Sequence, residues 1–276
     1  MAGGTRTEAR ARTAAQPAEQ PGLWRSVRPW AYGIAGVIGV LIVWAIIARY
    51  FAGTVGTIQR LAPPTEVAGK IASYVTGTFG IDVWSSFKVF LGGWLGGGIS
   101  ATLIGLLLGR VRVAGQMFIP IIEALRPVSS IVWVPLSVVW FGFGYTSKVF
   151  VVGLAVFLVV IVYAVDGCAR IPTDVQRTAT MLGMTSVQRF RSVILPATLG
   201  EVLVGLRVAL MAGWGTVIVA ELVAADTGLG AHLIYSQQSY DIAEVMATMV
   251  CFAVTGFVMN SLLSVAQRRL LPWQQG

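Results

Sequence analysis

Four charged residues interrupt segments of this sequence that are otherwise apolar: Glu123, Arg126, Arg207 and Glu221. A charge at such a position is costly in a lipid bilayer unless it faces protein or water. Each of the four therefore either has a structural role, in an ion pair or at a broken helix end, or lines a path for a polar solute. The sequence supports these two interpretations about equally.

The segment around Arg126 carries the most specific chemistry. Prolines at positions 120, 127 and 135 interrupt an apolar stretch, and a broken helix leaves backbone N–H groups without partners inside a membrane. Such groups, together with serine hydroxyls and a cation, favour a passing anion. Two tryptophans are candidates for an apolar gate, although a tryptophan in a span more often packs or anchors at an interface. The candidate path residues are Arg126, Ser129, Ser130, Trp133, Arg207, Trp214 and Glu221.

The sequence gives little support for catalysis by this chain. None of its lysines stands in the Gly-Lys-Ser/Thr context of a phosphate-binding loop. His232 is the only histidine, which excludes paired-histidine metal motifs and catalytic triads that need a second histidine. The aspartates fall at span ends or in loops, where an intramembrane protease could not use them. We therefore expect no catalytic residue, no metal ligands and no cofactor bound by this chain.

Composition places the chain in a membrane. Hydrophobic residues make up 56% of it, charged residues 12%, and the mean hydropathy is +0.77. A spanning helix needs about 20 apolar residues, and several segments reach or approach that length. The net charge of +8 then reports topology rather than nucleic-acid binding. We expect an all-α membrane protein with helices at Trp30–Ala48, Val89–Gly109, Val149–Val165, Leu203–Ala220 and Val245–Ala266.

The region from Val113 to Lys148 is either one discontinuous span or two. Counted as one, it gives the chain six spans and places most arginines on the side that holds both termini. Counted as two, it removes this asymmetry. Because basic residues tend to stay cytoplasmic, we predict six transmembrane helices with both termini inside.

These spans divide the chain into four parts. We predict a disordered cytoplasmic tail at 1–28, a first transmembrane helix at 29–50 and an extracytoplasmic loop with a short helix at 51–83. The remainder, 84–270, is a core of five spans. Glycines at positions 92 to 98 predict close helix contacts within this core or across a dimer.

A polar segment, 171–196, separates the fourth and fifth spans and faces the cytoplasm in this topology. It contains two candidate capping boxes, Thr173-x-x-Gln176 and Thr185-x-x-Gln188, which predict two short helices. Gly183 stands where the first helix must end, and Pro196 either stops the second helix or opens the next span.

This segment resembles the cytoplasmic coupling loop of ABC importer permeases, whose pattern is Glu-Ala-Ala, three residues, Gly, nine residues, Ile-x-Leu-Pro. Gly183 is followed ten positions later by Val193, then by Ile194, Leu195 and Pro196, while Arg177 stands where the family has Glu. The stretches LRPVSSIVWVPLSVVWFGFGYTSK, VGLRVAL and VAELVAADTGLG resemble the sulfonate, taurine and nitrate branch of these permeases. The resemblance covers approximately 61–273.

The resemblance implies a type I ABC importer permease core in the bacterial plasma (inner) membrane. The implied partners are a second copy of the permease, two cytoplasmic ATPases that use ATP and Mg, and an extracytoplasmic substrate-binding protein. The implied cargo is a small organic or inorganic anion such as a sulfonate, taurine or nitrate. The implied ATPase-coupling residues are Arg177, Thr178, Ala179, Gly183, Met184, Phe190, Leu195 and Pro196.

Other functions stay open at this point. A channel or secondary transporter would need no nucleotide, and a membrane scaffold or regulator would move no solute. No internal repeat is visible, which disfavours a complete secondary transporter. Within the permease family, the alternative cargo is an uncharged or aromatic precursor.

Overall fold

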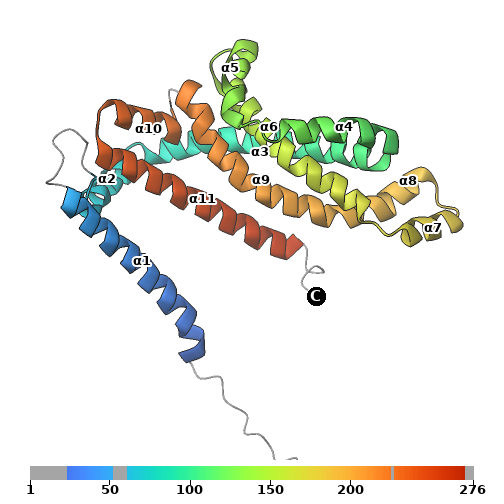
Figure 1. The fold of residues 1–276 in the computed structure, drawn as a ribbon, viewed down its shortest axis with the longest axis horizontal. Coiled ribbons are helices and arrows are strands. Elements are labelled where there is room, and N and C mark those ends of the chain that lie inside the picture. Colours follow the sequence, from blue (N-terminus) through green and yellow to red (C-terminus); the bar gives the residue numbers. More distant parts are fainter. Residues whose placement is uncertain (1–23, 52–60, 225–226, 271–276) are drawn as a thin grey trace, which may run out of the picture. The chain divides into compact units, whose positions relative to one another are not determined.

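The computed structural model describes residues 24–51, 61–224 and 227–270, and all the regular structure in these ranges is helical. The chain divides into two compact units, residues 1–58 and residues 59–276. Four of the described helices are long and apolar enough to cross a membrane, and one bent helix pair is a further candidate. The predicted all-α membrane fold is therefore confirmed (Figure 1).

The first unit holds helix α1, Trp24–Phe51. The helix covers the predicted first span at 29–50 and begins before it, so the last residues of the predicted tail are helical. The rest of that tail, residues 1–23, lies outside the described residues. The described apolar stretch of α1, Ala35–Tyr50, is shorter than the about 20 residues of a typical span, so the sixth span remains a prediction.

The second unit begins with the short helix expected in the loop, α2, Pro64–Thr76. Pro64 occupies its first turn, where a missing N–H costs nothing. Val67 and Tyr74 are buried, because α2 packs against the last helix, α11, Ile242–Leu270. The helix is therefore part of the core and not a free loop element.

Two long helices, α3 (Phe79–Arg110) and α6 (Tyr145–Ala169), form the centre of the core and run parallel. Their contacts are made at glycines, which let the two backbones approach closely. Residue numbers rise together along both helices, which establishes the parallel direction. The contacting pairs are Gly93 with Val152, Gly97 with Gly153, Gly105 with Ala164 and Gly109 with Cys168.

Helices α4 (Arg112–Leu125) and α5 (Ser130–Phe141) connect these two parallel helices and meet at an angle of 102°. Because α3 and α6 point the same way, the pair must return the chain from the end of α3 to the level where α6 begins. A single crossing of the membrane by the pair achieves this, whereas two crossings would bring the chain back to the level where α3 ends. The arrangement agrees with the single discontinuous span that the arginine distribution predicted.

Helix α9 (Leu195–Ala224) runs antiparallel to α6, with Gly205 against Tyr163 and Gly213 against Val156. A short helix, α10 (Leu229–Gln238), follows it and packs against both α9 and α11. This helix lies between the predicted spans Leu203–Ala220 and Val245–Ala266, where the sequence predicted no helix. The core thus has two ends, which we call the loop end and the α10 end.

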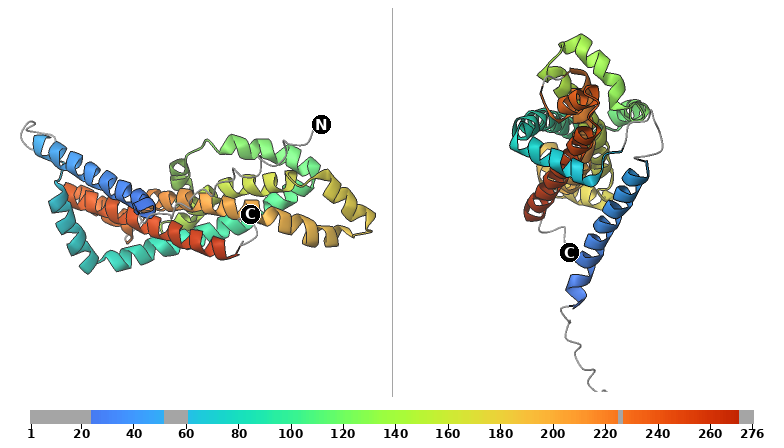
Figure 2. Two further views of the ribbon diagram at one scale, coloured as in Figure 1. Left: turned by 90° about the horizontal axis from the view of Figure 1, so that it is seen from below. Right: turned by 90° about the vertical axis from the view of Figure 1, so that its left-hand side faces the viewer.

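The loop end carries α7 (Thr173–Met181) and α8 (Ser186–Arg189), and the α10 end carries α2, α10 and the starts of α3 and α6. Figures 1 and 2 show both ends from different sides. Among the described residues, the basic side chains toward the α10 end are lysines, at positions 70, 88 and 148. Those at the loop end are Arg110, Arg170, Arg177, Arg189 and Arg191.

A wide π-helical turn, Phe190–Ile194, joins α8 to α9 without a break. Its characteristic hydrogen bond runs from the Leu195 N–H to the Phe190 carbonyl. Pro196 follows in the first turn of α9, where it has no N–H to donate and its ring crowds the carbonyl of the preceding turn. The wider turn makes room for the proline, and Pro196 lies in the first turn of the next span, which confirms the second of its two predicted roles.

Candidate functional site

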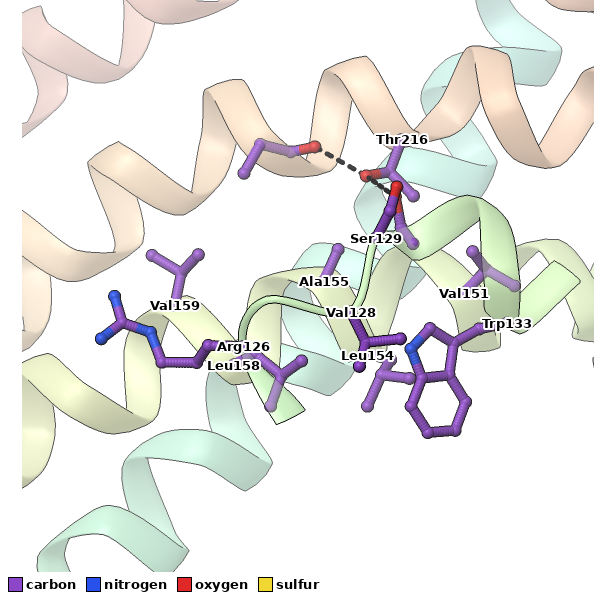
Figure 3. A pocket seen from close by; sticks show the side chains of 12 residues that line it. Arg126, Val128, Ser129, Trp133, Val151, Leu154, Ala155, Leu158, Val159 and Thr216 are labelled. Carbon is purple, nitrogen blue, oxygen red and sulfur yellow. Dashed lines mark hydrogen bonds between the residues drawn. The ribbon is translucent and has the colours of Figure 1, made fainter. Parts of the chain in front are cut away.

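A cavity of about 370 Å³ lies where the bent α4–α5 pair meets α6 and α9. It brings together four of the predicted path residues, Arg126, Ser129, Ser130 and Trp133. Its position is near the middle of α6, between the two ends of the core. Figure 3 shows its walls, which also include Val128, Val151, Leu154, Ala155, Leu158, Val159, Ala212 and Thr216.

The polar wall of the cavity comes from the break between α4 and α5. Arg126 caps the C-terminus of α4, donating its backbone N–H to the Ile122 carbonyl at 3.1 Å. Pro127 follows, and a residue before proline disfavours continued helix. Ser129 is the N-cap of α5 but its side chain makes no capping hydrogen bond, so N–H groups of the first turn of α5 remain without a side-chain acceptor. The sequence correctly placed this break.

One polar residue of the cavity, Thr216, was missed by the sequence analysis. Its hydroxyl lies 3.3 Å from that of Ser130 and donates to the Ala212 carbonyl at 2.9 Å. The available signal was a hydroxyl residue one turn after Ala212 in an apolar span, which alone does not distinguish a path residue from a packed one. Thr216 lines the cavity because α5 packs on α9.

Trp133 places its indole nitrogen in an unusual environment. The Nε1 atom is buried and has no hydrogen-bond partner among the described residues. In Figure 3 the nitrogen lies on the side of the ring that faces Val128 and Leu154, which line the cavity. The residue therefore presents a donor here and not only an apolar surface.

Two further predicted path residues do not reach this cavity. Trp214 is 3% exposed and stacks on Phe252 at a ring separation of 4.7 Å, donating its N–H to the Phe252 carbonyl at 3.3 Å. Trp214 thus packs against Phe252 and does not line this cavity. Arg207 is exposed and is not among the residues that line the cavity.

Glu221 also lies away from the cavity, in a buried cluster at the α10 end. Its two carboxylate oxygens accept from the Ser86 hydroxyl at 2.8 and 2.9 Å, and one of them also accepts from the Gly230 N–H at 2.8 Å. The adjacent Gly228 N–H donates to Asp82 at 3.1 Å. These contacts satisfy the first N–H groups of α10, which is the structural role that a carboxylate has at a helix N-terminus.

An ion-pair cluster joins α2 to the start of α11 at the same end. Lys70 Nζ contacts Asp241 Oδ2 and lies 3.5 Å from Glu244 Oε2. The hydrogen bond from Lys70 lowers the pKa of Asp241, and the same bond raises the pKa of Lys70. Both groups are therefore charged at neutral pH, and the cluster fastens the two helices.

The loop-end segment forms two short helices, as the sequence predicted. Thr185 caps α8 in a complete capping box with Gln188. Gly183 has φ of +71° and ends α7, while the Met184 N–H reaches back to the Ala179 carbonyl at 3.2 Å. The predicted capping box at Thr173 is wrong, because the N-cap is Pro172 and Thr173 already lies inside α7 without a capping hydrogen bond. Proline fixes the backbone there and no side-chain cap is formed.

The outer surface of this segment is unusually apolar. Met181 is 84% exposed, Leu182 72% and Val187 63%. Of the predicted coupling residues, Ala179 is buried, Met184 and Phe190 are half-buried, and Arg177 is exposed. Arg110, at the end of α3, lies over the Phe190 ring at 5.6 Å and donates to the Ser186 carbonyl at 3.4 Å. The segment is thus attached to the core and presents apolar side chains outward.

A family model described as "Binding-protein-dependent transport system inner membrane component" matches residues 101–275. The chain belongs to this family. The match covers α4 to α11, including both loop helices, α7 and α8. The residues that line the cavity and the exposed loop helices therefore lie within the shared region. A member of this family is a transport subunit of an ABC importer and not an enzyme.

Curated relatives of this permease span nearly its whole length. It is 30% identical over 92% of its chain to a probable ABC transporter permease protein of Brucella abortus (strain 2308), covering 97% of that protein. It is 31% identical to the taurine transport system permease protein TauC of Escherichia coli (strain K12), over 91% of this chain and 92% of the relative. It is 28% identical to the putative aliphatic sulfonates transport permease protein SsuC of Bacillus subtilis (strain 168), over 89% of this chain and 88% of the relative.

Membership of the family means that the permease works in the inner membrane with ATPase and substrate-binding components. Among its described residues, no group of three or more His, Cys, Asp or Glu side chains is placed to hold a metal ion. The cavity itself carries the Arg126 cation and the hydroxyls of Ser129, Ser130 and Thr216.

Proposed function

We propose that this permease forms the membrane path of an importer for a small anion. The supporting observation is the cavity at the break between α4 and α5, which carries the Arg126 cation and includes no carboxylate among its lining residues. An arginine at this depth is costly unless it faces water or an anion. Two relatives are named for the transport of taurine and of aliphatic sulfonates, which share a sulfonate oxyanion.

The loop end is the cytoplasmic end in this proposal, and both termini lie on that side. Arginines gather at the loop end, whereas the described basic residues toward the α10 end are lysines, which agrees with the tendency of basic residues to remain cytoplasmic. The α10 end then faces the substrate-binding protein. Two copies of the permease share the path, and each receives one ATPase.

Each ATPase docks on α7 and α8 and hydrolyses ATP with Mg, so the nucleotide chemistry takes place outside this chain. The exposed Met181, Leu182 and Val187 supply the apolar contact, and Arg110 transmits movement of the loop to α3. Closure of the two ATPases draws the loops together and tips the helices between inward-open and outward-open states.

The docking surface predicts the effect of a charge at Leu182. Leu182→Asp is expected to lower the amount of ATPase that copurifies with the permease at least tenfold, because a buried interfacial carboxylate without a partner is strongly unfavourable. The side chain is 72% exposed in the chain, so the melting temperature of the permease itself should be unchanged. Leu182→Met is the matched control and should retain the ATPase. Normal copurification by Leu182→Asp would contradict the docking surface.

The anion path predicts the effect of removing the Arg126 charge. Arg126→Gln is expected to reduce uptake of radiolabelled ethanesulfonate by the reconstituted importer at least tenfold, since a hydrogen bond to a charged group is worth about 1.5–3 kcal/mol. Arg126→Lys retains the charge and should keep most of the activity. The amount of assembled ATPase is measured in parallel. Unchanged uptake by Arg126→Gln in an intact complex would reject the path.

A further inference from the structure

The buried indole nitrogen of Trp133 needs an explanation that packing does not provide. A buried donor without an acceptor is unfavourable, and native proteins contain few of them. One other buried side-chain atom in the described residues lacks a hydrogen bond, His232 Nε2, and that atom lies 3.2 Å from Glu244 Oε1. Trp133 Nε1 has no hydrogen-bond partner among these residues. A donor held this way inside a cavity is suited to an acceptor that arrives with a ligand.

The arrangement of the cavity indicates what kind of ligand this is. In Figure 3, Arg126 lies toward one end, Trp133 toward the other, and Ser129 and Thr216 along the side formed by α9. Val151 lies beside Trp133 and Val159 beside Arg126, so Trp133 is nearer the α10 end and Arg126 nearer the loop end. Along this line the Arg126 guanidinium, the Ser129 hydroxyl and the Trp133 indole N–H can donate to a ligand, whereas the Thr216 hydroxyl donates to the Ala212 carbonyl.

The remaining wall is apolar, and no lining residue is acidic. Val151, Leu154, Ala155, Leu158 and Val159 of α6 form it. A small inorganic oxyanion would leave these apolar side chains uncovered and in contact with water, whereas an apolar organic group on the ligand would cover them. A ligand that also carries an ammonium group would place that charge near Arg126 or against hydrocarbon, without a carboxylate to pair with it.

We propose that Trp133 donates its indole N–H to an oxyanion cargo, and that the cavity selects oxyanions whose remainder is uncharged and apolar. This inference rests on the proposed function and makes it more specific. Trp133 meets the cargo near the α10 end, the Ser129 hydroxyl receives it next, and the Arg126 cation holds it nearest the loop end. Trp133 is therefore a specificity-determining residue and not part of an apolar gate.

The test uses ethanesulfonate and taurine, which differ by one ammonium group. Binding of each to the full-length chain in lipid nanodiscs is measured by saturation-transfer NMR, for the wild-type protein and for Trp133→Phe. Phenylalanine keeps an aromatic ring and removes the N–H. Ethanesulfonate is expected to bind the wild type at least tenfold more tightly than taurine, and Trp133→Phe is expected to weaken ethanesulfonate binding about tenfold.

Trp140→Phe is the matched control, because Trp140 is exposed and does not line the cavity, and it should bind ethanesulfonate like the wild type. Equal affinities for the two sulfonates, an unchanged affinity in Trp133→Phe, or no binding to the wild type would each overturn the inference. ATP hydrolysis and uptake by the reconstituted importer report the proposed function separately. An active importer whose permease shows one of these results would retain the proposed function and lose the role of Trp133.

Discussion

Gly97→Ala is expected to destabilise the permease by about 3 kcal/mol or more and to abolish its recovery as a folded, monodisperse protein. A Cβ atom at this position would lie 2.2 Å from the carbonyl oxygen of Gly153 and 2.9 Å from its carbonyl carbon. Both are backbone atoms, so no side-chain rotation can relieve the clash. The parallel α3–α6 contact must open along its length, and the bent α4–α5 pair depends on that contact.

Gly96→Ala provides a matched control one residue away. A Cβ atom at Gly96 would have no heavy atom within 4 Å, and alanine favours helix over glycine by up to about 1 kcal/mol. Thermal melting followed by size-exclusion chromatography in detergent should therefore show a normal Gly96→Ala protein and an aggregated or absent Gly97→Ala protein. Similar melting temperatures for the two variants would show that α3 and α6 do not pack through Gly97.

Glu221→Ala is expected to have the second large effect, a loss of about 3 kcal/mol of stability together with loss of transport. The substitution removes the acceptor of the Ser86 hydroxyl and of the Gly230 N–H, and both donors stay buried. The start of α10 then loses a carboxylate that satisfies its N-terminal N–H groups. The measurement is the melting temperature of the purified chain, followed by uptake in proteoliposomes.

Two comparisons separate this structural role from a role in the path. Glu221→Gln keeps one acceptor oxygen and should lose less stability than Glu221→Ala while retaining uptake. Glu123→Ala removes an exposed charge from α4 and should leave the melting temperature near that of the wild type. A Glu221→Gln protein that is stable but transports no anion would show that the carboxylate charge acts on the cargo.

Features with local causes were predictable from the sequence. The second loop helix begins directly after its N-cap, Thr185, because the capping box lies within four residues, and the first ends shortly before Gly183, whose backbone is left-handed. The break after Arg126 follows from Pro127 and its neighbours. Thr173 was misassigned for the same local reason, since Pro172 already fixed the helix start one residue earlier.

Features that depend on packing were not predictable. The glycines near position 97 indicated a close helix contact, but only the structure shows that the partner is α6 of the same chain and that the two helices are parallel. Trp214 and Glu221 have the residue types of path residues. In the structure, however, Trp214 stacks on Phe252, and the Glu221 carboxylate accepts from the Gly230 N–H at the start of α10. Thr216 joins the cavity because α5 rests on α9, which no spacing in the sequence records.

The wide turn at Phe190–Ile194 determines how the loop helices are oriented about the axis of α9. It accommodates one residue more than an α-helical turn would, and one residue corresponds to about 100° of rotation. Without that extra residue, the apolar face of α7 and α8 would point about a quarter of a circle away from its present direction while α9 kept its place in the core. The angular setting of the proposed ATPase contact therefore resides in a five-residue turn that touches neither the cavity at the α4–α5 break nor the glycine contacts.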